Sequence, residues 1–211
     1  MKRIDASPEG LVSLSWSPDG RWITLDSRVN GQSEIFVIAA DGGTPRRVTN
    51  GTGFGNAIPT WSADGGWLYF ASGRSGRQEV WKVPVGGGQM VQVTRAGGMA
   101  ALTIPGGTHL YYVKGPGQPG LFRMPIEGGE EQQVLAQATY WSNFGVAATG
   151  VYFASDRSRL QFLDAATGKV STLTVVDNIT EGLCVSPDGR YVVWTQRDRN
   201  TTDLMLVENF R

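Results

Sequence analysis

A turn motif that returns about every 42 residues constrains the fold of this chain more than any other feature of its sequence. The glycines that close successive turns are separated by 45, 42, 43 and 39 residues. The turns read Ser-Pro-Asp-Gly at Gly20 and Gly189, Ser-Ala-Asp-Gly at Gly65, and, in weaker form, Ile-Pro-Gly-Gly at Gly107 and Ala-Ala-Thr-Gly at Gly150. A period of this size is typical of β-propellers, in which each repeat forms a blade of four strands.

Each repeat has the composition of short antiparallel strands joined by tight turns. In the first turn Pro fixes φ, Asp bonds its own backbone and Gly takes a positive φ, which predicts a hairpin. A second, glycine-rich turn separates the third strand from a more polar fourth strand at the sheet edge. The second and third strands are apolar on both faces, as in 67–72 and 79–85, which indicates sheets covered by neighbouring sheets on both sides.

The two ends of the chain predict how the ring closes. The last repeat has no fourth strand, whereas the N-terminus has one strand to spare, so we expect residues 2–5 to pair with residues 203–207. The predicted fold is therefore all-β: a five-bladed β-propeller of four-stranded antiparallel blades, closed by the N-terminal strand. We expect one domain over residues 1–211, with blades at about 11–50, 56–95, 99–136, 143–175 and 182–207 plus 2–5.

The first two repeats resemble a known family. The segments WSPDGRWITLDSRVNGQSEIFVIAADGGTPRRVT and WSADGGWLYFASGRSGRQEVWKVPVGGGQMVQVT resemble the WD40-like, TolB-type propeller repeat, and SPDGRYVVW resembles it in the last blade. The ending DLMLVENFR is similar to the C-terminal propeller of bacterial winged-helix transcriptional regulators. This resemblance implies a sensor or interaction propeller of a regulatory protein, without DNA binding by this chain.

Charge and composition exclude several functions. Nineteen basic residues balance nineteen acidic ones, so there is no electrostatic footprint for nucleic acid or an anionic membrane. No apolar stretch follows the basic start, so we expect a cytoplasmic protein, or a periplasmic one if the chain is part of a larger exported or membrane-anchored protein. The single cysteine, Cys184, lies in an apolar run and is predicted to be a small buried residue.

Residues that recur at one position in several repeats are most simply part of the scaffold. His109, the only histidine, occupies the position of Trp22, Trp67 and Tyr191, so we expect it to fill an aromatic packing position. The recurring arginines form either a cationic ring or a structural feature of the repeat: Arg28, Arg74, Arg157 and Arg197. Because no catalytic triad or metal-binding loop is evident, we predict no catalytic residue, metal or cofactor.

Aromatic and polar residues that do not recur mark the candidate site. They lie in the connections between blades and in the loops after the second strands, which share one face of a propeller. Such residues are typical of recognition surfaces. The candidates are Phe54, Asn56, Arg74, Tyr140, Trp141, Asn143 and Arg157. Trp141 could instead begin an inner strand, as Trp16 and Trp61 do.

These features favour a non-catalytic binding module whose partner is a protein or peptide. A small ligand is the second choice of partner, and we expect a monomer. The alternative is a propeller hydrolase or lactonase with its site at the channel mouth, which the fold alone does not exclude. A partial gene product that has lost its partner domains is a third reading.

Overall fold

A computed structural model describes residues 11–50, 54–104, 106–115, 117–136, 143–186, 188–198 and 201–208 of the protein. For residues 11–12, 198 and 201–208 only the backbone is described. Contacts group the chain into two compact units, residues 1–102 (unit 1) and 103–211 (unit 2), and each is described by itself.

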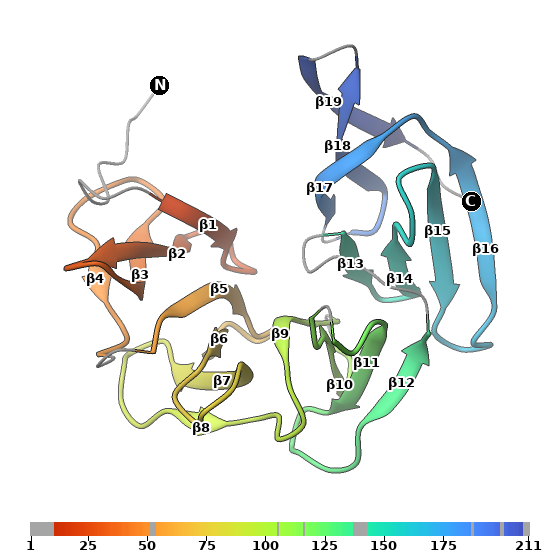
Figure 1. Cartoon of the computed structure of the whole chain (residues 1–211). Helices are drawn as coiled ribbons and strands as arrows, with labels where there is room; N and C mark the ends of the chain where they lie inside the picture. Colours follow the sequence, from red (N-terminus) through yellow and green to blue (C-terminus); the bar gives the residue numbers. More distant parts are fainter. Residues whose placement is uncertain are drawn as a thin grey trace. The chain divides into compact units, whose positions relative to one another are not determined.

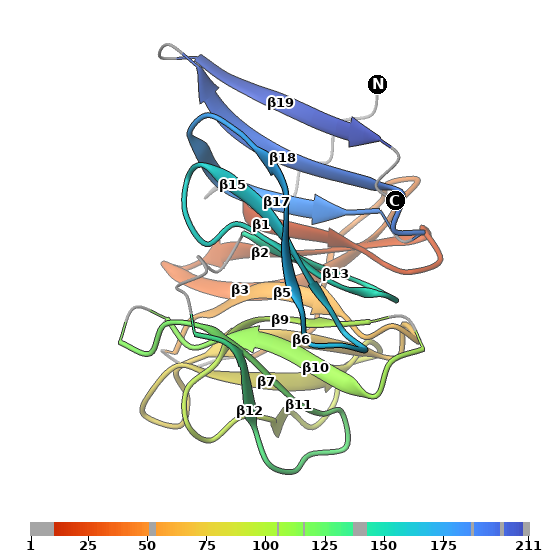
Figure 2. The ribbon, with the colours of Figure 1, turned by 90° about the vertical axis from the view of Figure 1, so that its right-hand side faces the viewer.

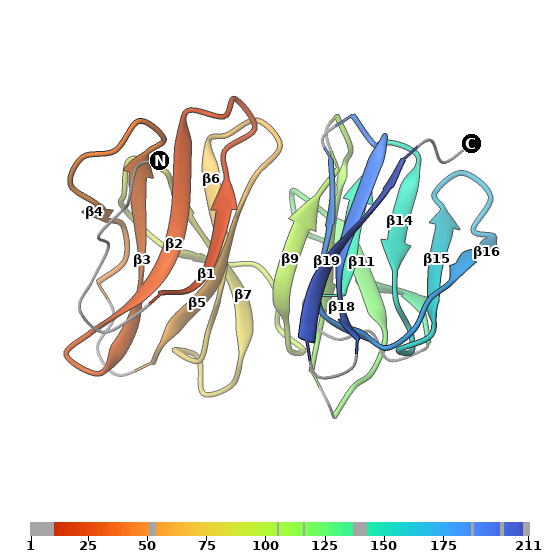
Figure 3. The ribbon, with the colours of Figure 1, turned by 90° about the horizontal axis from the view of Figure 1, so that it is seen from above.

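Unit 1 contains two four-stranded antiparallel sheets (Figure 1). Sheet 1, in the order β1-β2-β3-β4, consists of β1 (Leu11–Trp16), β2 (Trp22–Val29), β3 (Gln32–Ala39) and β4 (Arg46–Arg47). Sheet 2, in the order β5-β6-β7-β8, consists of β5 (Asn56–Trp61), β6 (Trp67–Ser72), β7 (Glu79–Pro84) and β8 (Val91–Gln92). Figure 3 shows β1, β2 and β3 side by side. Both fourth strands are two residues long, as suits a sheet edge.

Unit 2 contains sheets 4 and 5, and the unit boundary falls inside the first strand of sheet 3. Sheet 3, in the order β12-β11-β10-β9, consists of β9 (Met99–Thr103), β10 (His109–Val113), β11 (Leu121–Pro125) and β12 (Gln132–Leu135). Sheet 4 consists of β13 (Phe144–Ala147), β14 (Gly150–Phe153), β15 (Arg159–Asp164) and β16 (Val170–Val175). Sheet 5 consists of β17 (Ile179–Val185), β18 (Tyr191–Asp198) and β19 (Thr201–Glu208), whose last two strands form a long hairpin (Figure 2).

The prediction of an all-β fold built from four-stranded antiparallel sheets is confirmed. All regular secondary structure in the described residues is β-strand, and sheets 1 to 4 have four strands each. The described residues include no helix that could span a membrane. Sheet 5 has three strands, and residues 2–5, the predicted fourth strand, lie outside the described residues.

A hydrogen-bond network explains why the Ser-x-Asp-Gly turn recurs. In the first repeat the Ser17 hydroxyl donates to Asp19 Oδ1 at 2.6 Å and accepts from the backbone N–H of Trp22 at 2.9 Å. Asp19 Oδ1 also accepts from the N–H of Arg21 at 3.0 Å. The same three bonds recur in two other repeats, among Ser62, Asp64, Gly66 and Trp67 and among Ser186, Asp188, Arg190 and Tyr191. The motif therefore locks the first hairpin of a sheet by satisfying backbone donors within the turn.

Neighbouring sheets within each unit pack face to face. In unit 1, Trp61, Leu68 and Phe70 of sheet 2 bury their side chains against Ile35 and Val37 of sheet 1. In unit 2, sheets 4 and 5 form a second core: Ala147, Tyr152, Ala154 and Leu160 with Ile179, Leu183, Val192 and Trp194. In these two pairs of sheets, one apolar face of each sheet is covered by its neighbour.

The close approach of sheets 4 and 5 requires a glycine in β13. A Cβ atom built on Gly145 would lie 2.5 Å from Val185 Cγ2 and 3.3 Å from Leu183 Cδ2, both on β17. Since real Cβ atoms do not approach other atoms so closely, any side chain at this position would push the two sheets apart.

The first strands of three sheets carry a backbone distortion at the same repeat position. Positive φ angles occur at Ile58 in β5 (55°), Ala100 in β9 (49°) and Gly182 in β17 (114°). Each of these residues lies three positions before the last residue of its strand. In β5 and β17 a register shift accompanies the positive φ. Two of the three positions therefore hold a residue with a Cβ atom in a conformation that costs of order 1–3 kcal/mol.

Two expectations about single residues can be compared with the structure. His109 begins β10 and pairs with Pro125, as Trp67 pairs with Pro84, so the two residues do occupy equivalent positions. The prediction that Cys184 is buried is wrong, because this residue of β17 is exposed between inward-facing neighbours. Nearby protein atoms still desolvate its sulfur enough to raise the pKa of the thiol, which disfavours the reactive thiolate.

Candidate functional site

Two of the predicted site residues, Asn56 and Arg74, belong to a closed polar network in unit 1. Asn56 is fully buried; its Nδ2 donates to Glu34 Oε2 at 3.0 Å, and its Oδ1 accepts from Arg74 at 2.9 Å. Arg74 Nε also donates to Ser72 Oγ at 3.2 Å. Both side chains are therefore already engaged in holding β3, β5 and β6 together.

The guanidinium of Arg74 is also covered by aromatic rings. It lies 4.9 Å from the ring centroid of Trp81 and 5.7 Å from that of Phe70. This burial lowers the pKa of Arg74, while the charge of Glu34 opposes the shift. Arg74 thus acts as a structural feature of its repeat, one of the two alternatives that the recurring arginines left open.

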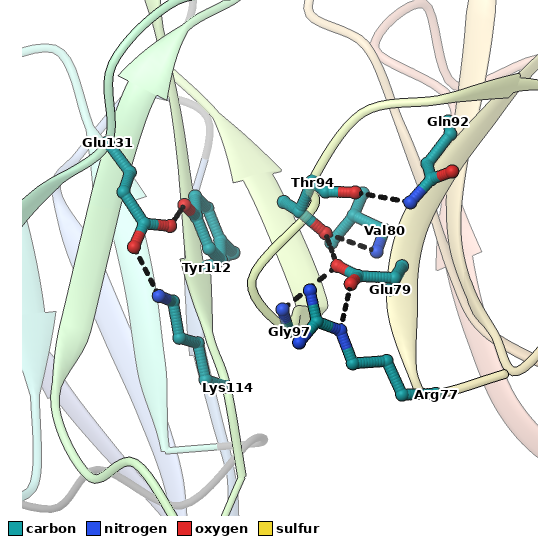
Figure 4. Close-up of polar contacts among 9 residues, drawn as sticks. All are labelled: Arg77, Glu79, Val80, Gln92, Thr94, Gly97, Tyr112, Lys114 and Glu131. Carbon is teal, nitrogen blue, oxygen red and sulfur yellow. Dashed lines mark hydrogen bonds and ion pairs between the residues drawn. The ribbon is translucent and has the colours of Figure 1, made fainter. Parts of the chain in front are cut away.

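Buried glutamates anchor the third strands of sheets 1 and 2, which the sequence analysis did not anticipate. In sheet 2, Glu79 Oε2 accepts from the Thr94 hydroxyl at 2.6 Å and from the N–H of Gly97 at 3.0 Å, while Oε1 pairs with Arg77 at 2.5 Å (Figure 4). In sheet 1, Glu34 makes the equivalent bond with Thr49 at 2.5 Å and also pairs with Arg47. The signal in the sequence was a Glu followed by a Thr fifteen residues later in both repeats.

Sheet 3 uses a different acidic residue. Glu131 accepts from the Tyr112 hydroxyl at 2.8 Å and pairs with Lys114 (Figure 4). Partial burial raises the pKa of Glu131, but the hydrogen bonds from Lys114 and Tyr112 outweigh it and lower the pKa overall. Its two partners therefore hold this carboxylate in the ionised form. Like Glu34 and Glu79, Glu131 has a structural role.

A pocket of about 380 Å³ lies in unit 2 where sheets 4 and 5 meet. It brings together two further predicted residues, Asn143 and Arg157, with parts of β17 and β18. The lining residues are Asn143, Ala154, Ser155, Asp156, Arg157, Ile179, Thr180, Glu181, Thr195 and Arg197. We call it the Asn143 pocket.

Asn143 is the most buried polar side chain of this pocket, with 6% of its surface exposed. Its Oδ1 accepts a hydrogen bond from the backbone N–H of Gly182 at 3.0 Å. Because a backbone N–H can only donate, this contact fixes which end of the amide faces sheet 5. The Nδ2 group has no hydrogen-bond partner among the described residues and is left as a donor for the pocket.

The charged side chains of the pocket are unequally engaged. Asp156 accepts from the backbone and hydroxyl of Ser158 and lies 3.6 Å from Arg159, and the hydrogen bonds from Ser158 lower its pKa. Arg157, Glu181 and Arg197 are exposed and have no side-chain partner among the described residues. As far as the described residues show, the pocket therefore presents two guanidinium groups, one carboxylate and the amide of Asn143 that are available to a ligand.

The remaining predicted residues are not part of this arrangement as described. Tyr140 and Trp141 lie outside the described residues. Phe54 belongs to unit 1, where its ring is 48% exposed and its carbonyl accepts from the N–H of Gly73 at 3.4 Å. Sequence reasoning missed Glu181 and Thr180, which β17 places in the pocket.

The chemistry available in the pocket is that of hydrogen bonding and charge recognition. His109 does not line it, and the described residues contain no group of three or more His, Cys, Asp or Glu side chains that could hold a metal ion. Donors from Asn143, Arg157 and Arg197 converge from three separate segments of the chain. Such convergence of a few polar groups is typical of binding pockets.

Comparison with solved structures shows a propeller fold. TolB from Acinetobacter baumannii superposes with a TM-score of 0.77 and 21% identity over 95% of this chain and 52% of that one. A putative TolB from Agrobacterium tumefaciens superposes with a TM-score of 0.69 and 20% identity, over 94% of this chain and 74% of that one. A puromycin-hydrolysing peptidase of Mycobacterium tuberculosis superposes with a TM-score of 0.66 and 19% identity, over 92% of this chain and 35% of that one.

Sequence comparison leads to the same family. The Tol-Pal system protein TolB of Syntrophus aciditrophicus (strain SB) is 32% identical over 50 residues, which are 24% of this chain and 11% of that protein. This chain spans about half the length of the A. baumannii TolB. None of these relatives supports the winged-helix regulator context that the chain's ending suggested. The sequence model of PD40, the TolB beta propeller domain, matches residues 2–116, more than half of the chain, which therefore belongs to the TolB β-propeller domain family.

Proposed function

We propose that the protein is a non-catalytic binding module that takes a protein or peptide partner at the Asn143 pocket. The observation that carries this proposal is the convergence of Asn143, Arg157 and Arg197, whose free donors come from three segments that only packing of sheets 4 and 5 brings together. Free polar side chains around a buried floor are what a recognition site requires, because each can pair with a partner without first breaking an internal bond.

Family membership suggests the kind of partner and the compartment. The curated relative is a Tol-Pal system protein, so components of such a system are the first candidates for partners of this chain. The same kinship favours the periplasmic alternative over the cytoplasmic expectation. The hydrolase alternative rests on fold similarity at 19% identity, which does not carry an activity.

We further propose that the five sheets form a closed five-bladed ring, in which the last sheet covers the first. Sheet 1 supports this proposal with an exposed apolar face on β1, where Leu14 and Trp16 are 60% and 55% exposed. An exposed apolar face of this kind is typical of a surface that packs against another element. Light scattering after size exclusion, on the full chain and on a chain lacking residues 1–6, tests closure: loss of the folded monomer on truncation supports it, and unchanged behaviour rejects it.

Peptide selection tests the proposed function. Peptides selected from a displayed library for binding to the full chain are measured by calorimetry against the wild type and the double variant R157A/R197A, whose exposed side chains have no described partners to lose. We expect the double variant to bind about tenfold more weakly or worse, since charge-assisted hydrogen bonds are lost. R21A/R95A is the matched control, because both arginines are exposed, lie outside the pocket and have no side-chain partner among the described residues. Equal binding by wild type and double variant would reject the pocket as the site.

The enzyme alternative needs its own measurement. Wild-type protein is incubated with chromogenic aminoacyl anilides and with simple lactones, and product is followed against a buffer blank. We expect no turnover. A rate that is saturable and abolished in a pocket variant would overturn the non-catalytic assignment.

A further inference from the structure

We infer that the Asn143 pocket recognises a carboxylate group of a peptide, an inference that rests on the proposed function and specifies its ligand. The pocket offers a buried amide donor beside two guanidinium groups. Carboxylates are the anions whose planar pair of acceptors matches such donors.

The amide donor of Asn143 is held in place before a ligand arrives. The hydrogen bond from Gly182 fixes Oδ1, so the orientation of Nδ2 is fixed as well. Only 6% of the surface of Asn143 is exposed, and its Nδ2 has no hydrogen-bond partner among the described residues. Because Nδ2 is not fully enclosed, this donor is accessible from the pocket that Asn143 lines.

The side chains of the two arginines have no partner among the described residues, while their backbones are held by hydrogen bonds. The carbonyl of Arg157 accepts from the N–H of Ile179 at 2.8 Å, and the N–H of Arg197 donates to the carbonyl of Asn178 at 3.1 Å. Elsewhere in the described residues, arginines at comparable positions are engaged, as Arg74 is with Asn56. Two anchored but unpaired guanidinium groups at one pocket are a site for an anion.

The net charge of the pocket determines which charge the anion should carry. The charge of Asp156 is balanced by Arg159 at 3.6 Å, so among the described residues the unpaired charges of the pocket are those of Arg157, Arg197 and Glu181. Two positive charges and one negative charge leave a single excess positive charge. A monoanion therefore matches the pocket, whereas Glu181 would repel the second charge of a phosphate.

NMR of arginine side chains provides the test. The Nε–Hε signals of wild-type protein are followed during titration with three probes at constant ionic strength: N-acetylalanine, N-acetylglutamic acid α-amide and the neutral N-acetylglutamine amide. We expect saturable shifts of Arg157 and Arg197 with the carboxylate probes and none with the neutral probe. Arg74 serves as an internal reference, because its Nε–H already donates to Ser72.

The two carboxylate probes distinguish the sources of the group. Tighter binding of N-acetylalanine identifies a chain terminus, and tighter binding of the glutamate derivative identifies an acidic side chain. Shifts that are equal for the neutral probe, or that grow without saturation at all exposed arginines, would overturn the inference. Inorganic phosphate binding more tightly than either carboxylate would overturn it too.

Variants of the pocket sharpen the result. N143D keeps an acceptor for the N–H of Gly182 but replaces the free donor by a negative charge, so we expect carboxylate binding to fall by about tenfold or more with little change in Tm. E181Q removes the opposing charge and should strengthen binding several-fold. If selected peptides lose affinity for R157A/R197A while no carboxylate probe binds, this inference fails and the proposed function stands.

Discussion

Asn143, which directly precedes β13 of sheet 4, accepts a hydrogen bond from the backbone N–H of Gly182 in sheet 5, with 3.0 Å between Oδ1 and N. The bond reaches across two sheets because Gly182 has φ of 114° within the register shift of β17, between Ile179 and Leu183. A distortion of one strand thus supplies the contact that fixes the floor of the Asn143 pocket. The same contact has a measurable consequence for stability.

Removing the acceptor should destabilise the packing of sheets 4 and 5. We expect N143A to lower the free energy of unfolding by about 1–2 kcal/mol, because the N–H of Gly182 loses its partner. N143D retains an acceptor and is expected to lose less than half of that amount. Urea unfolding followed by tryptophan fluorescence measures both variants, and equal losses would show that the bond to Gly182 is unimportant.

The turn aspartates should make stability depend on pH in the acid range. Hydrogen bonds from the serine hydroxyls and the following backbone N–H groups lower the pKa of Asp19, Asp64 and Asp188 from the ordinary value of 3.8. A lowered pKa in the folded state stabilises the protein above about pH 4, and this contribution is lost as the pH falls through the folded pKa.

The triple variant D19N/D64N/D188N removes these charges. We expect it to be less stable than wild type at pH 7 and to lose less stability between pH 5 and pH 2, measured as the urea midpoint at each pH. The variant S17A/S62A/S186A, which removes the hydroxyl donors, should flatten the same profile. Parallel pH profiles for all three proteins would contradict the assignment.

Backbone strain at Ala100 predicts an unusual response to glycine. Ala100 has φ of 49°, whereas its neighbour Ala101 is not among the residues with positive φ, and both are buried in β9. A100G relieves strain that A101G does not, so we expect A100G to be about 1 kcal/mol more stable than A101G. Thermal unfolding of A100G and A101G tests this prediction, because both variants lose one methyl group and differ only in the backbone conformation at the substituted residue. Equal Tm values would show that Ala100 is not strained.

Ring closure predicts that two tryptophans at the same repeat position behave alike. Trp61 is 7% exposed, its indole N–H donates to the carbonyl of Ser15 at 3.1 Å, and W61A should cost about 3–5 kcal/mol. In a closed ring Trp16 would be covered in the same way, and W16A should cost a similar amount. A loss below about 1 kcal/mol for W16A would mean that its face stays open to solvent.

The sequence by itself determined the β-architecture of this protein, because its signals are local. Each Ser-x-Asp-Gly turn closes its own hydrogen bonds within six residues, and alternating turns and apolar strands then define the sheets. The repeat period also predicted the equivalence of His109 and Trp67. Cys184 shows the limit of this reasoning, since an apolar neighbourhood in sequence did not decide which way its side chain faces.

Only the tertiary structure decided which of the recurring arginines are free. Arg74 and Arg157 both follow an Ala-Ser pair at the end of a second strand. Arg74 stacks on Trp81, which lies opposite Phe70 on the third strand of sheet 2. In sheet 4 the equivalent position, opposite Phe153, holds Gln161. No aromatic ring of the described residues covers Arg157, which lines a pocket whose walls come from segments up to 40 residues away in β17 and β18. Such a pocket depends on how two sheets pack, and packing is a property of many side chains together that no single repeat encodes.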